Sequence, residues 1–135
     1  MPTHDDLSQA SLADLQAARG WQNRYKILLG WSRLIREKPA IRQPENLIKG
    51  CETPTWLVAE KAGDRFRFAI DSDSRVVKGL AVLLLLLADG KSADDIQSER
   101  IEQTFTALEL GKHLSPSRSN GFKGMLDRLR QLTNS

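Results

Sequence analysis

A run of five leucines, from Leu83 to Leu87, limits the possible folds of this 135-residue chain more than any other segment. The apolar stretch around it, from Leu80 to Ala88, is much shorter than the roughly 20 residues that a membrane-spanning helix needs. Asp and Ser side chains just before it, in residues 71–74, are typical of helix N-caps. The sequence therefore predicts a helix from about Arg75 to Ala88 that is apolar nearly all round and buried at the centre of the molecule.

A change of pattern over residues 46–70 predicts a small antiparallel sheet. Residues 65–70 alternate, with Phe66, Phe68 and Ile70 on one face and arginines on the other. The Ala-Gly-Asp sequence at 62–64 is typical of a turn, with a strand from Thr55 to Lys61 before it and a further short strand at 46–49. The predicted fold class is α+β, a small antiparallel sheet of about three strands packed against several helices.

Cap and turn residues place the other helices. We expect a first helix capped by Ser11 and ended near Gly20, a second over residues 21–35, an extended loop between Pro39 and Pro44, two helices within residues 93–110, and a last helix begun by Ser115 and Pro116. The length suits a single core, so we expect one domain over residues 1–135.

The composition argues against several classes of protein. A net charge of +3 and a pI of about 9.2 make the chain only mildly basic, and without a basic stripe or aromatic platform we expect no nucleic-acid binding. The single cysteine forms no internal disulfide and is typical of a reducing compartment. Residues 1–6 do not begin a secretory signal. These features predict a cytoplasmic protein without a membrane segment.

Charge is unevenly distributed along the chain. Residues 24–49 carry seven basic and two acidic side chains, residues 89–109 two basic and six acidic, and residues 112–135 five basic and one acidic. Two interpretations are open: solvated helix faces, or a bipolar surface that docks on a charged protein partner.

Cys51 is the main candidate for chemistry. It follows Gly50 and precedes Pro54, between two short apolar runs, so we expect it on a loop at the rim of the sheet. A lone thiol on a loop can attack, be attacked or carry a group. The alternative is that Cys51 is a small buried hydrophobic residue.

Other kinds of site have less support. With only Cys51, His4 and His113 as Cys or His ligands, and with His4 in a terminus that we expect to be flexible, we expect no metal, and no motif predicts an organic cofactor. A thiol enzyme that uses Cys51 and His113 is conceivable, although no orienting third group is evident. A non-catalytic adaptor that only binds a charged partner is a further alternative.

Four segments together resemble the SufE/CsdE family of sulfur-acceptor proteins, and they span about residues 21–130. The family's elements are matched, in order, by WQNRY from Trp21 to Tyr25, NLIKGC from Asn46 to Cys51 with Trp56 five residues on, DSDSRVVKGL from Asp71 to Leu80, and LSPSRSNGF from Leu114 to Phe122. The sequence differs from the family's usual pattern at two places. Residues 35–39 are more charged, and Thr53-Pro54-Thr55 precedes Trp56.

The resemblance implies a sulfur acceptor and desulfurase activator. On this resemblance, Cys51 is expected to take sulfur as a persulfide from a pyridoxal-phosphate-dependent cysteine desulfurase, SufS-like or CsdA-like, and to pass it to an iron–sulfur scaffold or another acceptor. A monomer or weak dimer is expected.

The resemblance also suggests roles for residues around the thiol. Arg118 is expected near the loop, where it stabilises a thiolate or persulfide, or alternatively pairs with the Asp71–Asp73 turn. Gly50 and Asp73 are expected to support the loop. Asp73 and Ser72 are expected first to cap the buried helix and second to influence the loop. Trp56 is expected in the core.

Overall fold

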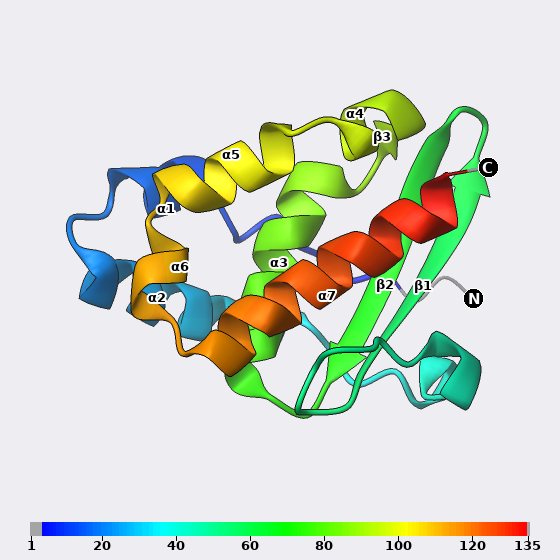
Figure 1. Cartoon of the computed structure of the whole chain (residues 1–135), viewed down its shortest axis with the longest axis horizontal. Helices are drawn as coiled ribbons and strands as arrows, with labels where there is room; N and C mark the ends of the chain where they lie inside the picture. Colours follow the sequence, from blue (N-terminus) through cyan, green and yellow to red (C-terminus); the bar gives the residue numbers. More distant parts are fainter. Residues whose placement is uncertain (1–3, 135) are drawn as a thin grey trace.

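The computed structural model describes residues 4–134, which fold as helices packed on one small sheet (Figure 1). Residues 1–3, part of the segment 1–6 in which we expected no secretory signal, lie outside this range. The described elements, with 3₁₀ turns written η, are α1 (Leu12–Ala17), α2 (Trp21–Trp31), η1 (Ser32–Leu34), η2 (Pro39–Ile41), η3 (Pro44–Asn46), β1 (Thr55–Ala62), β2 (Arg65–Ser72), α3 (Arg75–Ala88), β3 (Lys91–Ser92), α4 (Ala93–Gln97), α5 (Arg100–Ala107), α6 (Leu110–His113) and α7 (Pro116–Thr133). The predicted α+β class is confirmed.

The sheet is antiparallel with the strand order β1-β2-β3. The alternation predicted for β2 is confirmed, because Phe66, Phe68 and Ile70 are all buried. The predicted strand at 46–49 is wrong: residues 44–46 form η3, and Leu47 makes only an isolated bridge with Trp56. The third strand is instead β3, whose two residues are too short to leave a periodic pattern in the sequence.

Helix α3 has the predicted bounds and lies at the centre of the molecule, behind α7 in Figure 1. Its N-cap is Ser74, whose hydroxyl accepts a hydrogen bond from the Val77 N–H at 3.2 Å. Leu80, Leu83 and Leu84 are completely buried, which confirms the buried core helix. Gly79 permits α2 to approach closely, since a Cβ there would lie 2.3 Å from the Leu28 carbonyl oxygen.

Several local predictions need correction. Pro39 and Pro44 each begin a 3₁₀ turn rather than bracketing an extended loop, because a proline fits the first position of a helical turn. The short helix α6 was not predicted. Trp56 is only half-buried, and its ring stacks against the Arg42 guanidinium, 4.5 Å from the ring centroid, instead of entering the core.

The predicted starts of the first and last helices are confirmed. Ser11 caps α1, and Ser115 precedes α7 with Pro116 at its first position. His4, expected to be flexible, is held to the sheet: its Nδ1 lies 3.1 Å from the Phe68 carbonyl oxygen. None of the described helices is both long and apolar enough to cross a membrane.

Candidate functional site

Cys51 lies at the tip of a loop that connects η3 to β1. The loop is closed at its neck by the Ile48 N–H, which donates to the Thr55 carbonyl at 2.9 Å, and by the Leu47–Trp56 bridge. Gly50 has a φ of 90°, a left-handed conformation that residues with a side chain rarely adopt. The neck and the glycine turn together present the thiol to the flank of α7.

Two glycines of α7 make room for the thiol. The Cys51 S–H points to the Gly121 carbonyl oxygen, with Sγ at 3.7 Å. A Cβ on Gly121 would lie 3.8 Å from Sγ, and a Cβ on Gly124 would lie 3.7 Å from Sγ and only 2.9 Å from the Lys49 carbonyl oxygen. Since positions three apart share one face of a helix, these glycines form a flat surface that the loop covers. Sequence reasoning missed both, although their spacing was a visible signal.

The thiol borders a small cavity of about 170 Å³ between the loop, the start of α3 and the first turns of α7. The walls are formed by Cys51, Glu52, Thr53, Ser74, Val77, Ser117, Arg118 and Gly121. Cys51 and Arg118, predicted from sequence to lie near each other, thus border one cavity.

Burial raises the pKa of the Cys51 thiol, and a hydrogen bond with the Thr55 side chain opposes this only in part. The resting thiol is therefore neutral and sheltered. Arg118 is exposed, and its Nη1 donates to the Tyr25 hydroxyl at 3.2 Å. The alternative ion pair of Arg118 with Asp71 or Asp73 is not formed, because Arg42 occupies both carboxylates.

Asp71 and Asp73 belong to a network around Arg42. Asp71 is fully buried and accepts hydrogen bonds from the Lys38 N–H at 2.7 Å and from Arg42 Nε at 2.9 Å. Burial alone raises the pKa of Asp71, but Arg42 and the backbone donors of Lys38 and Ser72 outweigh it and hold the pKa below its ordinary value. Asp73 is exposed, and its carboxylate accepts a hydrogen bond from Arg42 Nη1 at 3.0 Å. The N-cap of α3 that we expected from Asp73 is therefore supplied by Ser74.

Ser72 supports the loop, a role that sequence reasoning placed second to helix capping. Its hydroxyl donates to the Pro54 carbonyl at 3.2 Å and lies 3.0 Å from the Thr55 hydroxyl. These contacts fix the C-terminal end of the Cys51 loop to β2. A serine beside a buried aspartate carries no sequence signal that distinguishes this role.

The structure does not bring His113 to the thiol. His113 stacks on Trp21, with ring centroids 5.2 Å apart, and it does not line the Cys51 cavity. Within residues 4–134 there is no cluster of three or more Cys, His, Asp or Glu side chains suited to a metal ion.

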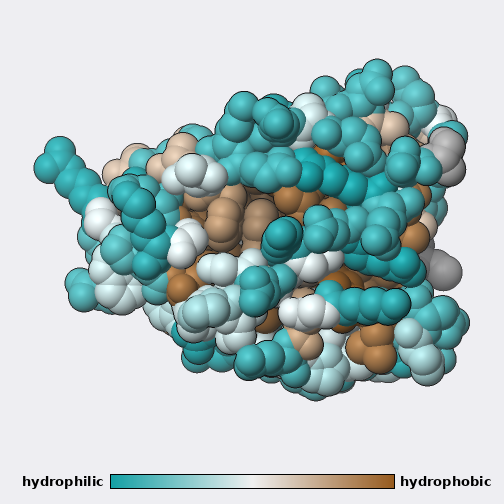
Figure 2. Space-filling model, viewed as in Figure 1, coloured by the Kyte–Doolittle hydropathy of each residue, from teal (hydrophilic) through white to brown (hydrophobic). Residues whose placement is uncertain are grey.

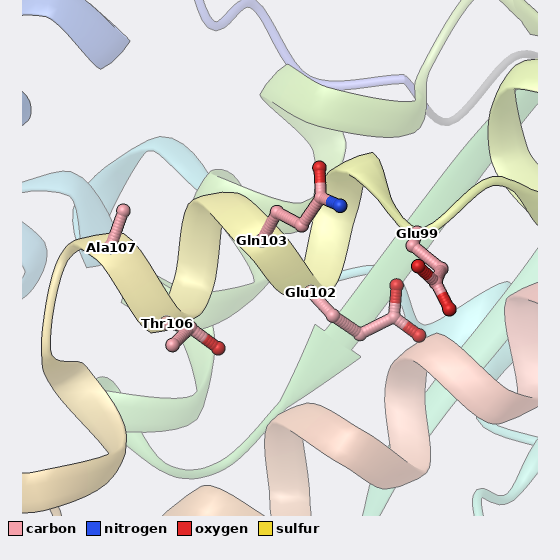
Figure 3. Close-up of a pocket in the computed structure, with 5 residues that line it drawn as sticks. All are labelled: Glu99, Glu102, Gln103, Thr106 and Ala107. Carbon is pink, nitrogen blue, oxygen red and sulfur yellow. The ribbon is translucent and has the colours of Figure 1, made fainter.

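Larger hollows lie elsewhere but contain no nucleophilic thiol. One of about 410 Å³ lies along α5, where the Glu99 and Glu102 side chains extend toward α7 (Figure 3). Another, lined by Phe105, Phe122 and Leu126, lies between α5 and α7, where Figure 2 shows apolar surface between hydrophilic ridges. The Cys51 cavity is therefore the candidate functional site because a thiol borders it, although the other hollows are larger.

Comparison with known proteins gives a consistent result. Residues 9–133 match the family model described as "SufE: Fe-S metabolism associated domain". An uncharacterized SufE-like protein of Rhizobium etli is 32% identical, over 97% of this chain and 95% of its own length. A second, of Rhizobium meliloti, is 31% identical over 82% of each chain. The solution structure of a hypothetical protein from Thermus thermophilus has a TM-score of 0.72 at 21% identity, covering 95% of this chain and 93% of its own, and so shares the fold.

Proposed function

This chain belongs to the SufE family, with a role in Fe–S metabolism and sulfur transfer, and from this premise we propose that it accepts sulfur on Cys51 from a cysteine desulfurase and passes it on. The observation that carries the proposal is the placement of the chain's only thiol. Cys51 lies at the tip of a narrow-necked loop, half-buried against Gly121 and Gly124. A purely structural cysteine has no need of a glycine-lined helix flank and a cavity beside it.

Sulfur transfer in this proposal is one thiol exchange. The Cys51 thiolate attacks the outer sulfur of a persulfide on the desulfurase, and the Cys51 proton passes to solvent. A new S–S bond forms at Cys51 Sγ while the S–S bond of the donor breaks, and its electron pair leaves with the donor's cysteine thiolate. No external oxidant or reductant is required. The donor regains a free cysteine for its next turnover, and this is how the protein activates it.

The closed loop and the exchange reaction make opposite demands on the thiol. Burial keeps Cys51 protonated, which protects it from oxidants but also from the exchange, since the thiolate is the nucleophile. We infer that the loop leaves the α7 flank during transfer, which returns the pKa of Cys51 toward its ordinary value. The neck at Ile48 and Thr55, with Ser72 holding the Pro54 carbonyl, lets residues 49–53 move while β1 stays in place.

Arg118 has a supporting role in the proposal. It borders the cavity and has a fixed positive charge, and within residues 4–134 it makes no ion pair. The loaded persulfide is an anion when it transfers sulfur onward. Arg118 can stabilise that anion when the loop returns. The second acceptor is an iron–sulfur scaffold or another sulfur-using protein.

The test is transfer of labelled sulfur in a mixture of desulfurase, labelled cysteine and this protein. A sulfur acceptor gains label on Cys51 that is released by a reducing thiol. An adaptor speeds the desulfurase without gaining label, and a thiol enzyme turns over its own substrate without a desulfurase. Absence of label on Cys51 under conditions where the desulfurase forms its own persulfide overturns the proposal.

A further inference from the structure

Trp21 is one of two large apolar side chains that are exposed within the described residues, at 40%; the other is Leu47, at 43%. Trp21 is the first residue of α2. Its indole stacks on the His113 ring, with centroids 5.2 Å apart and planes at 10°, and it meets the Tyr25 ring edge-on at 6.3 Å. These contacts hold a large apolar surface in one orientation although much of it faces water.

A row of side chains connects this indole to the Cys51 cavity. The Tyr25 hydroxyl, next to Trp21, accepts the hydrogen bond from Arg118 Nη1 at 3.2 Å. Arg118 in turn lines the cavity that Cys51 borders. We call Trp21, His113, Tyr25 and Arg118 the aromatic–arginine row. It brings α2 together with α6 and the first turn of α7, which lie far from α2 in the sequence but meet it at the left of Figure 1.

The chemistry of the row is that of a protein-binding anchor. Trp, Tyr and Arg are the residues most enriched among side chains that dominate binding energy in interfaces. Trp21 and Tyr25 offer rigid rings with an apolar face, and Arg118 offers guanidinium donors that no carboxylate within residues 4–134 occupies. A complementary partner surface has an apolar side chain for the indole and a carboxylate for the guanidinium.

We propose that the aromatic–arginine row is the anchor by which the sulfur-donating protein docks before the loop opens. This inference rests on the proposed function. The donor is the occupant because the row continues through Arg118 into the cavity that Cys51 borders, and the donor must bring its persulfide to that cavity. Four side chains are fewer than a complete interface of about 800 Å² per partner requires, so the row supplies the anchor and the remaining contacts come from its surroundings.

The test compares Trp21→Ala with Gln103→Ala, a control that removes an exposed, uncharged side chain on α5, a helix that contributes neither to the row nor to the Cys51 cavity. The dissociation constant for the desulfurase is measured by calorimetry with the full-length proteins. Loss of a hot-spot side chain predicts affinity about 30-fold weaker for Trp21→Ala and unchanged for Gln103→Ala. Iodoacetamide reacts with Cys51 at the wild-type rate in both, because neither change touches the thiol.

Two further variants keep the test decisive if Trp21→Ala disturbs the start of α2. Trp21→Phe retains an aromatic ring and recovers most of the affinity. Tyr25→Phe removes only the hydroxyl that holds Arg118 and weakens binding by a smaller factor than Trp21→Ala.

Three results overturn the inference: a wild-type dissociation constant for folded Trp21→Ala, equal losses of affinity from Trp21→Ala and Gln103→Ala, or a defect in delivery to the second acceptor with normal donor binding. A wild-type protein that binds the desulfurase but gains no sulfur overturns the proposed function instead. The two failures are therefore distinguishable.

Discussion

At the scale of single residues, the shelter around Cys51 sets the reactivity of the only thiol in the chain. The loop contributes Gly50 with its left-handed backbone, and α7 contributes the flat surface at Gly121 and Gly124. Arg118 borders the same cavity but is held by Tyr25. With the loop closed, the Cys51 thiol therefore stays protonated and reacts slowly as a nucleophile.

The first prediction concerns the ionisation of that thiol. Burial raises the pKa of Cys51 in the folded state, so the native thiol is deprotonated at higher pH than the same residue in the unfolded chain. The rate of iodoacetamide alkylation as a function of pH is expected to have a higher midpoint in native protein than in urea. By linkage, this thiol stabilises the fold below its unfolded pKa, and that contribution is lost as pH rises through the folded pKa. Coincident midpoints for native and unfolded protein would contradict the sheltered thiol.

A second prediction concerns Gly124. An alanine there places its Cβ 2.9 Å from the Lys49 carbonyl oxygen, so the loop must move away from α7. We expect Gly124→Ala to speed alkylation of Cys51 at neutral pH. Gly30→Ala is the matched control, because that glycine is also helical but has nothing within 4 Å of its Cβ position. It should leave alkylation unchanged and stabilise α2 by up to about 1 kcal/mol. Equal alkylation rates in the two variants would mean that the loop does not rest on Gly124.

At the scale of elements, α3 organises the molecule, and the sequence predicted its bounds because caps and composition agree. Ser74 caps the start of α3, two residues after β2 ends, and the apolar run that follows is too uniform to face water on any side. The Cys51 loop was also predictable, from the unique cysteine between a glycine and a proline. The strand β3 was not, since two residues form a strand only because β2 supplies a partner.

The third prediction tests the packing of α3. Leu84 is fully buried, and its replacement by alanine leaves a cavity that costs about 2–5 kcal/mol of unfolding free energy. Leu86→Ala is the control, because Leu86 lies in the same helix but is only half-buried, and this substitution should lower the unfolding free energy by less. Urea denaturation of both variants measures the difference. A midpoint for Leu84→Ala equal to that of the wild type would place this side chain outside the core.

At the scale of the whole molecule, the site depends on contacts between distant segments. Cys51 meets Gly121 and Arg118 meets Tyr25, across separations of 70 and 93 residues. Local patterns contain no information about which distant residues pair, and for this reason the contacts of Gly121 and Gly124 with the loop and of Tyr25 with Arg118 were not predicted. Arg118 was placed near the thiol only through the family resemblance.

The fourth prediction concerns charge. Basic and acidic side chains are segregated along the chain, and complementary charge mainly accelerates association. Raising the salt concentration is therefore expected to slow sulfur transfer from the desulfurase, and Arg118→Ala is expected to slow it further without unfolding the protein. Alkylation of Cys51 by uncharged iodoacetamide is the control and should not respond to salt. Transfer that is indifferent to both changes would leave the charged surface as ordinary solvated helix.

The central claim is that Cys51 carries the sulfur. The most direct measurement is the intact mass of wild type and Cys51→Ser after incubation with desulfurase and cysteine, with and without a reducing thiol. The wild-type protein is predicted to gain the mass of sulfur and to lose it on reduction, while folded Cys51→Ser gains none. Sulfur retained by the serine variant, or a wild-type mass that never changes beside an active desulfurase, would contradict the account.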